Sequence, residues 1–249
     1  MSLIATTDTP STDTPSTDTA PISATSTLPA ATLPPVRPVV LGAKLAAVGL
    51  VAGAALNTAE AVLGQFLPDR PASIPEQLRL VGEHAVLYGV RTVTGTLAVP
   101  LMVVAFLAAA KVAAPAARRT SVTAAVLLLA GMWGFLGMHV VNLLQLPAAR
   151  LGGVPGAAAL LEQAQADPVL GLMFLLPFLV GCAGGLVLLV VALFRCPGLP
   201  RWIPAAWLVF LVLDFAVRPG GPVDPHWLFL AGAVGLAVHI LRGRVAAFE

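Results

Sequence analysis

The chain has 249 residues, of which 58% are hydrophobic and only 10% are charged, and its formal net charge is +2. Because soluble domains carry about 25% charged residues, this composition excludes an ordinary soluble enzyme, a disordered chain and a basic nucleic-acid-binding protein. The composition instead predicts an all-α integral membrane protein that contacts the lipid bilayer and binds no nucleic acid.

Residues 1–37 differ in composition from the rest of the chain. The pentad TDTPS occurs at residues 7–11 and again at 12–16, and Thr, Ser, Ala and Pro dominate as far as Pro35. Such a segment has too little apolar surface to offset the entropy lost on ordering. It also lacks the basic start and apolar core of a secretory signal. We therefore expect a disordered cytoplasmic tail at 1–37 and one membrane domain at 38–249.

The membrane domain contains six apolar segments, and a helix needs about 20 mostly apolar residues to cross the hydrocarbon core. The segments lie at residues 39–66, 85–112, 120–146, 169–194, 201–218 and 226–242. No segment alternates apolar and polar residues as the strands of a membrane barrel do. The sequence therefore predicts a polytopic bundle of about six transmembrane helices, of which the last two are short.

Basic residues are distributed unequally between the two sides of this predicted bundle. One side collects nine of them: Arg37, Lys44, Lys111, Arg118, Arg119, Arg195, Arg201, Arg242 and Arg244. The other side collects five: Arg70, Arg79, Arg91, Arg150 and Arg218. The positive-inside rule assigns the richer side to the cytoplasm, so we expect both termini to be cytoplasmic.

The segments between the predicted spans on the outer side also carry local signals. Ser73 and Glu76 have the spacing of a capping box, which predicts that a helix begins near Ile74. Residues 157–166 are expected to form a short helix on the outer surface, and residues 218–225 a tight turn.

The first span carries a stripe of small and polar residues on one helix face, because its members are spaced by three or four positions. The stripe comprises Gly42, Ala46, Gly49, Gly53, Asn57, Glu60 and Gly64. Gly49 and Gly53 form a GxxxG pair, which allows another helix to approach closely. That helix belongs either to this chain, to a partner membrane protein or to a second copy. In each case Asn57 and Glu60 point away from lipid.

Polar residues from several spans fall near the outer membrane boundary. Ionisable residues inside a membrane are costly and mark functional sites by default. The candidate binding site comprises Asn57, Glu60, Arg91, His139, Asn142, Asp214 and Arg218. Two interpretations remain open, namely an outward-facing pocket and structural ion pairing of Glu60 with Arg91 and of Asp214 with Arg218.

The first functional hypothesis is a non-enzymatic module without a cofactor. It would bind a small or lipid-like ligand, or a partner membrane protein, through the outer polar residues. The absence of the GxSxG, HExxH and Walker motifs favours this hypothesis. No catalytic residue is assigned under it.

Two other hypotheses belong to different classes. The chain could be a membrane-embedded enzyme acting on an isoprenoid or lipid, with Glu60 and Asp214 as acid and base. In size and in its two carboxylates it resembles small membrane-embedded terpene cyclases, although its aromatic content of 6% is low for a cation-guiding pocket. The third hypothesis is a haem site, because antiparallel neighbouring spans would bring His84 and His139 together as axial ligands.

The last third of the chain carries a family resemblance. Its elements read ADPVLGLMFLLPFLVGCAGGLVLLVVALFR, then LPRWIPAAWLVFLVLDF, then a glycine-rich final span. These elements resemble the uncharacterised six-span integral membrane proteins of high-GC Gram-positive bacteria. The resemblance implies a bacterial cytoplasmic membrane location and a six-span topology, and it implies no activity.

Overall fold

The structure is a computed structural model, and it describes residues 41–151, 155–217, 224–243 and 248. The predicted tail at 1–37 lies outside the described residues. Arg218 and most of the predicted turn at 218–225 do so as well.

The described residues form helices, and no strand occurs among them. The α-helices are α1 (Ala43–Gly64), α2 (Ile74–Glu83), α3 (Ala85–Arg150), α4 (Pro155–Ala166), α5 (Pro168–Leu170), α6 (Gly185–Phe194), α7 (Trp202–Leu211) and α8 (His226–Leu241). Three segments are π-helical: η1 (Gly171–Leu175), η2 (Pro177–Gly184) and η3 (Val212–Val217). All six predicted apolar segments coincide with helices, which confirms the all-α class.

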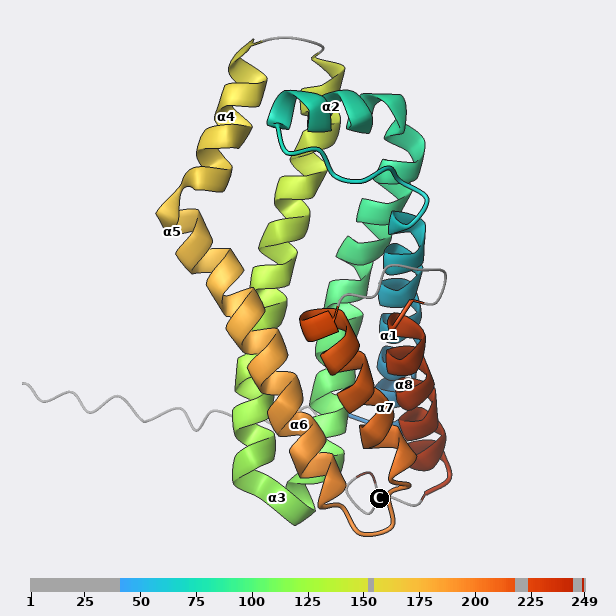
Figure 1. Cartoon of the computed structure of the whole chain (residues 1–249). Helices are drawn as coiled ribbons and strands as arrows, with labels where there is room; N and C mark the ends of the chain where they lie inside the picture. The colour runs from blue at the N-terminus through green and yellow to red at the C-terminus, as the bar shows by residue number, and fades with distance from the viewer. Residues whose placement is uncertain (1–40, 152–154, 218–223, 244–247, 249) are drawn as a thin grey trace, which may run out of the picture. The chain divides into compact units, whose positions relative to one another are not determined.

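The 66 residues of α3 contain two antiparallel legs. The helix breaks at Ala117, where φ is −151° and ψ is 57°, two residues after Pro115. We call residues 85–116 the first leg and residues 118–150 the second leg; they correspond to the second and third predicted spans. Figure 1 shows the legs running side by side from the turn at Ala117 to the end of the domain where α2 lies. These two ends are named the Ala117 end and the α2 end.

Within the described part of the chain, three helices are long and apolar enough to cross a membrane: α1, α3 and the continuous run Pro168–Phe194. The last two apolar helices are shorter, and the 16 residues of α8 extend only about 24 Å against a hydrocarbon core of about 30 Å. Large apolar side chains such as Val48, Val126 and Leu172 are more than half exposed. That outward apolar surface is typical of a protein embedded in lipid.

The α3 legs organise the packing. Helix α1 packs against α3 and α8, whereas η2 and α6 pack against α3, and α7 packs against α8 and α6. A Cβ added at Gly53 would lie 2.9 Å from the backbone of Leu101 and Met102. The GxxxG face of α1 is therefore used for packing within the chain, which is the first of the alternatives that the stripe left open.

A second close approach joins the second leg to η2. A Cβ at Gly131 would lie 2.6 Å from the Cys182 backbone nitrogen, so only glycine permits this separation. Prolines and glycines interrupt this part of the chain, where the helix is π-helical over Gly171–Leu175 and Pro177–Gly184. Because π-helical turns are uncommon and occur often at functional sites, these segments bear on the position of the site.

The α2 end is covered by short helices (Figure 1). Ser73 caps α2 by accepting a hydrogen bond from the Glu76 backbone nitrogen at 3.4 Å, which confirms the predicted helix start at Ile74. The helix predicted at 157–166 is present as α4, and α2 packs against both α3 and α4.

Candidate functional site

The structure distributes six of the seven predicted site residues over three places. Glu60, Arg91 and His139 come together where α1 faces both legs of α3. Asn142 belongs to a separate hydrogen-bond network, whereas Asn57 and Asp214 line a cavity. Arg218 lies outside the described residues, so the predicted Asp214–Arg218 pair remains a prediction.

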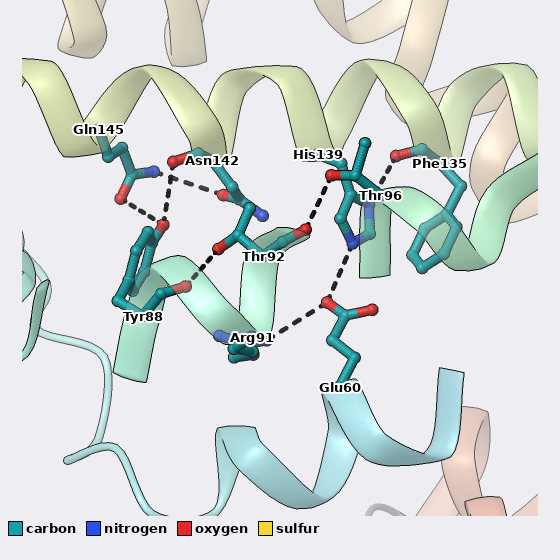
Figure 2. Close-up of polar contacts among 9 residues, drawn as sticks. All are labelled: Glu60, Tyr88, Arg91, Thr92, Thr96, Phe135, His139, Asn142 and Gln145. Carbon is teal, nitrogen blue, oxygen red and sulfur yellow. Dashed lines mark hydrogen bonds and ion pairs between the residues drawn. The ribbon is translucent and has the colours of Figure 1, made fainter. Parts of the chain in front are cut away.

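The centre of the first group is the contact between Glu60 and His139. The Nε2 atom of His139 lies 3.0 Å from Glu60 Oε1, and its Nδ1 atom lies 2.9 Å from the Phe135 carbonyl oxygen. The His139 side chain is 2% exposed and the Glu60 side chain 12%. Figure 2 shows Glu60 reaching from α1 toward the ring of His139 on the second leg.

Gly95 on the first leg makes this contact possible. A Cβ at this position would collide with the Glu60 carboxylate and with His139 Nε2. The two polar groups therefore lie directly on the backbone of the first leg. Sequence reasoning missed Gly95, because an isolated glycine in an apolar helix gives no sign of what packs against it.

Arg91 completes the group from the first leg. One of its guanidinium nitrogens, Nη2, lies 3.9 Å from Glu60 Oε1, which bears out the predicted pairing of these residues. The side chain is 34% exposed and lies over Gly64, where a Cβ would be 3.2 Å from Arg91 Nε. At this distance and exposure the ion pair contributes little to stability, but it places a positive charge beside the Glu60 carboxylate.

The second place is a buried network of amides and one phenol. Gln145 Oε1 accepts hydrogen bonds from Gln77 Nε2 at 2.9 Å and from the Tyr88 hydroxyl at 3.0 Å. Its own Nε2 donates to Asn142 Oδ1 at 3.4 Å. These bonds connect α2 to both legs of α3, as Figure 2 shows for the two legs. We conclude that Asn142 helps hold the α2 end together.

The third place is a cavity of about 90 Å³ lined by residues of α1, both legs of α3, η2, α6, α7, η3 and α8. Six of the ten phenylalanines of the chain line it: Phe106, Phe135, Phe178, Phe210, Phe215 and Phe229. The low aromatic content of the sequence argues against an aromatic pocket. The structure differs from that expectation, because folding gathers the few phenylalanines of distant segments around one cavity.

Polar residues also contribute to the wall of this cavity. The Asn57 side chain is 8% exposed and makes no hydrogen bond within the described part of the chain. Asp214 comes from the π-helical segment η3, and His226 comes from the start of α8. His226 Nδ1 lies 2.7 Å from Asp224 Oδ1 and 4.0 Å from Asp214 Oδ1. The cavity wall therefore combines phenylalanine rings with an amide and an acid–histidine group.

The haem hypothesis finds no support in the arrangement of its two histidines. His139 lies against Gly95 of the first leg. His84 comes eleven residues before Gly95, a separation of about 16 Å along a helix. Both ring nitrogens of His139 already face an oxygen atom. The structure thus does not bring His84 and His139 together as a pair of ligands.

No family model, curated protein or solved structure matches the chain. The described residues form an apolar cavity with polar wall residues and, beside it, a buried acid–histidine contact.

Proposed function

We propose that this chain is a non-enzymatic integral membrane protein that binds a small or lipid-like molecule in its phenylalanine-lined cavity. The observation that carries the proposal is the position of the Asn57 amide in the wall of this otherwise largely apolar cavity. A ligand with a hydroxyl or carbonyl group would give this amide a hydrogen-bond partner inside the cavity.

The lining restricts the chemistry of the ligand. Phenylalanine rings favour an apolar or aromatic body, and an amide can donate to a carbonyl or accept from a hydroxyl. The volume of about 90 Å³ accommodates one ring or the end of a slender chain. An isoprenoid or other lipid-like molecule with one hydroxyl or carbonyl group meets these requirements.

The membrane setting is part of the proposal. We place the chain in a bacterial cytoplasmic membrane with about six spans and with both termini cytoplasmic. Among the described residues, seven basic side chains lie at the Ala117 end: Lys44, Lys111, Arg118, Arg119, Arg195, Arg201 and Arg242. Four lie toward the α2 end: Arg70, Arg79, Arg91 and Arg150. This inequality supports a cytoplasmic Ala117 end.

Native mass spectrometry of the protein in nanodiscs tests the binding proposal. We expect a discrete bound mass in the wild type that is lost in Met132→Phe, because Met132 lines the cavity and the larger ring fills it. The matched control is Val126→Phe on the same leg, since Val126 is 61% exposed and faces away from the cavity. Equal bound masses in the wild type and Met132→Phe would contradict the proposal.

One observation favours a second candidate, the membrane-embedded enzyme acting on an isoprenoid. Asp214 lines the same cavity as the six phenylalanine rings, and aromatic faces stabilise cations. Glu60, the other predicted acid–base residue, contacts His139 instead and is not among the residues that line this cavity. The test is incubation with a linear prenyl alcohol and analysis of products. A cyclised product that disappears in Asp214→Asn would establish the enzyme, and unchanged alcohol would remove it.

A further inference from the structure

The hydrogen bonds of His139 determine which of its ring nitrogens carries a proton. The Phe135 carbonyl oxygen can only accept a hydrogen bond, and it lies 2.9 Å from His139 Nδ1. Nδ1 must therefore carry a proton and donate it. A neutral imidazole has one proton on nitrogen, so its Nε2 atom would then present a lone pair.

The second contact requires a further proton. Nε2 lies 3.0 Å from Glu60 Oε1, and an ionised carboxylate is also only an acceptor. A neutral imidazole facing a carboxylate would set two lone pairs against each other at hydrogen-bond distance. The contact forms only if one proton lies between the atoms, either on Nε2 or on the carboxyl group.

We infer that Glu60 and His139 form a proton-binding site within the helix bundle, with the proton held on His139 Nε2 and donated to Glu60. The Arg91 guanidinium, 3.9 Å from Glu60 Oε1, favours the ionised carboxylate over the protonated carboxyl group. The proton between the two side chains is then carried by the imidazole, which the carboxylate stabilises. Arg91 is 34% exposed and Glu60 is 12% exposed at the side chain, so the site is within reach of solvent from the Arg91 side.

Two charged groups of the described residues face His139, and the role of each can be tested by substitution. Glu60 faces His139 from α1, and Arg91 faces the pair from the first leg. Three further titratable groups line the same cavity as Phe135, namely Cys182 from η2, Asp214 from η3 and His226 from α8.

The proton site adjoins the cavity through Phe135. The rings of Phe135 and His139 meet edge to face with centroids 4.3 Å apart, and Phe135 stacks on Phe178 at 5.3 Å. Both phenylalanines line the cavity. If the proton leaves, one of the two His139 contacts must break, and the ring that supports Phe135 shifts. Protonation thereby regulates the shape of the cavity. An effect of protonation on ligand binding rests, in addition, on the proposed function.

Glu60→Gln is the matched variant for this inference. A glutamine amide donates to the Nε2 lone pair while Nδ1 donates to Phe135, so a neutral imidazole satisfies both contacts. The variant therefore retains the hydrogen-bond geometry and eliminates the additional proton. His139→Gln identifies the His139 signal, because the chain contains only four histidines.

The first measurement is ¹⁵N NMR of histidine-labelled full-length protein in nanodiscs. We expect both ring nitrogens of His139 to be protonated in the wild type near neutral pH, and only Nδ1 to be protonated in Glu60→Gln. A neutral His139 ring beside an ionised Glu60, with the carboxyl state read by infrared spectroscopy, would overturn the inference. No ligand is needed, so the outcome is independent of the proposed binding function.

The second measurement follows the environment of Phe135 by ¹⁹F NMR of protein labelled with fluorophenylalanine. The variant Phe135→Leu identifies the Phe135 signal. We expect the Phe135 resonance to move between neutral and alkaline pH in the wild type and to stay in place in Glu60→Gln. A resonance that moves equally in both proteins would overturn the coupling, because another titrating group would then cause the shift.

Discussion

The Glu60 carboxylate and the His139 imidazole lie 79 residues apart in the sequence and meet at 3.0 Å above the backbone of Gly95. Helix α1 supplies the acid, the second leg of α3 supplies the ring, and the first leg supplies the space. The contact therefore reports on the packing of three helical segments at once. A change at any one of them should alter the other two.

Substitution of Gly95 by alanine should separate this pair. The added Cβ would collide with both polar groups, and overpacking of a buried site costs about 1–3 kcal/mol. We expect the free energy of unfolding in detergent to fall by that amount. Gly89→Ala on the same leg is the control, because its Cβ would lie 3.7 Å from Leu146, an ordinary contact. Alanine there should be neutral or stabilising by up to about 1 kcal/mol, and equal destabilisation of both variants would refute the explanation.

The contact between the second leg and η2 should be similarly intolerant of a side chain. Gly131→Ala would place a methyl group 2.6 Å from the backbone nitrogen of Cys182, and backbone atoms cannot move aside as a flexible side chain can. We expect a loss of about 1–3 kcal/mol and a lower melting temperature. Gly184→Ala in η2 should cost less, since its nearest neighbour would be Leu127 Cδ1 at 4.0 Å. The opposite order of stability would show that the two segments are packed differently.

The buried amide network should depend most on Gln145, which is 2% exposed. Gln145→Leu leaves the donors of Gln77 and Tyr88 without their acceptor, so we expect a loss of about 2–4 kcal/mol. Tyr88→Phe removes one of those donors and should cost about 1 kcal/mol. Thermal unfolding of both variants, with the exposed Gln163→Leu as control, measures the difference. A Gln145→Leu protein as stable as the control would mean that the network does not form.

Cysteine labelling in intact cells tests the proposed orientation. Cysteines introduced at Glu76 and Glu162, both exposed at the α2 end, should react with an impermeant maleimide, whereas one at Arg118 should not. Native Cys196 should give little background, because it is 7% exposed and burial raises the pKa of its thiol, which lowers the thiolate fraction. Its reaction should therefore need more alkaline pH than that of an exposed thiol. Labelling only at Arg118 would reverse the orientation.

Local structure was predictable where short-range physics determines it. The apolar segments predicted every long helix. A segment in lipid has no water to bond its backbone, so its backbone groups must hydrogen-bond within the segment, as they do in a helix. Ser73 and Glu76 marked the start of α2 for an equally local reason, since a side chain caps a helix three residues away. The pairing of Glu60 with Arg91 followed from charge and from the expected adjacency of the first two spans.

The candidate site was only partly predictable. All seven residues were expected at one depth, yet Asn142 bonds within the amide network and Asn57 lines the cavity. Depth along a helix follows from residue number, but rotation about the helix axis and the choice of neighbour do not. Those two variables decide which polar side chains at one depth meet.

By itself the sequence determined the helical class, the helix positions and the side of the chain that carries more basic residues, because composition, periodicity and charge act over a few residues. Only the tertiary structure decided that Gly95 admits the Glu60–His139 contact and that six phenylalanines from distant segments line one cavity. These features depend on contacts between residues far apart in the chain. Such contacts are specified by complementary shapes of whole helix surfaces, which no local pattern records.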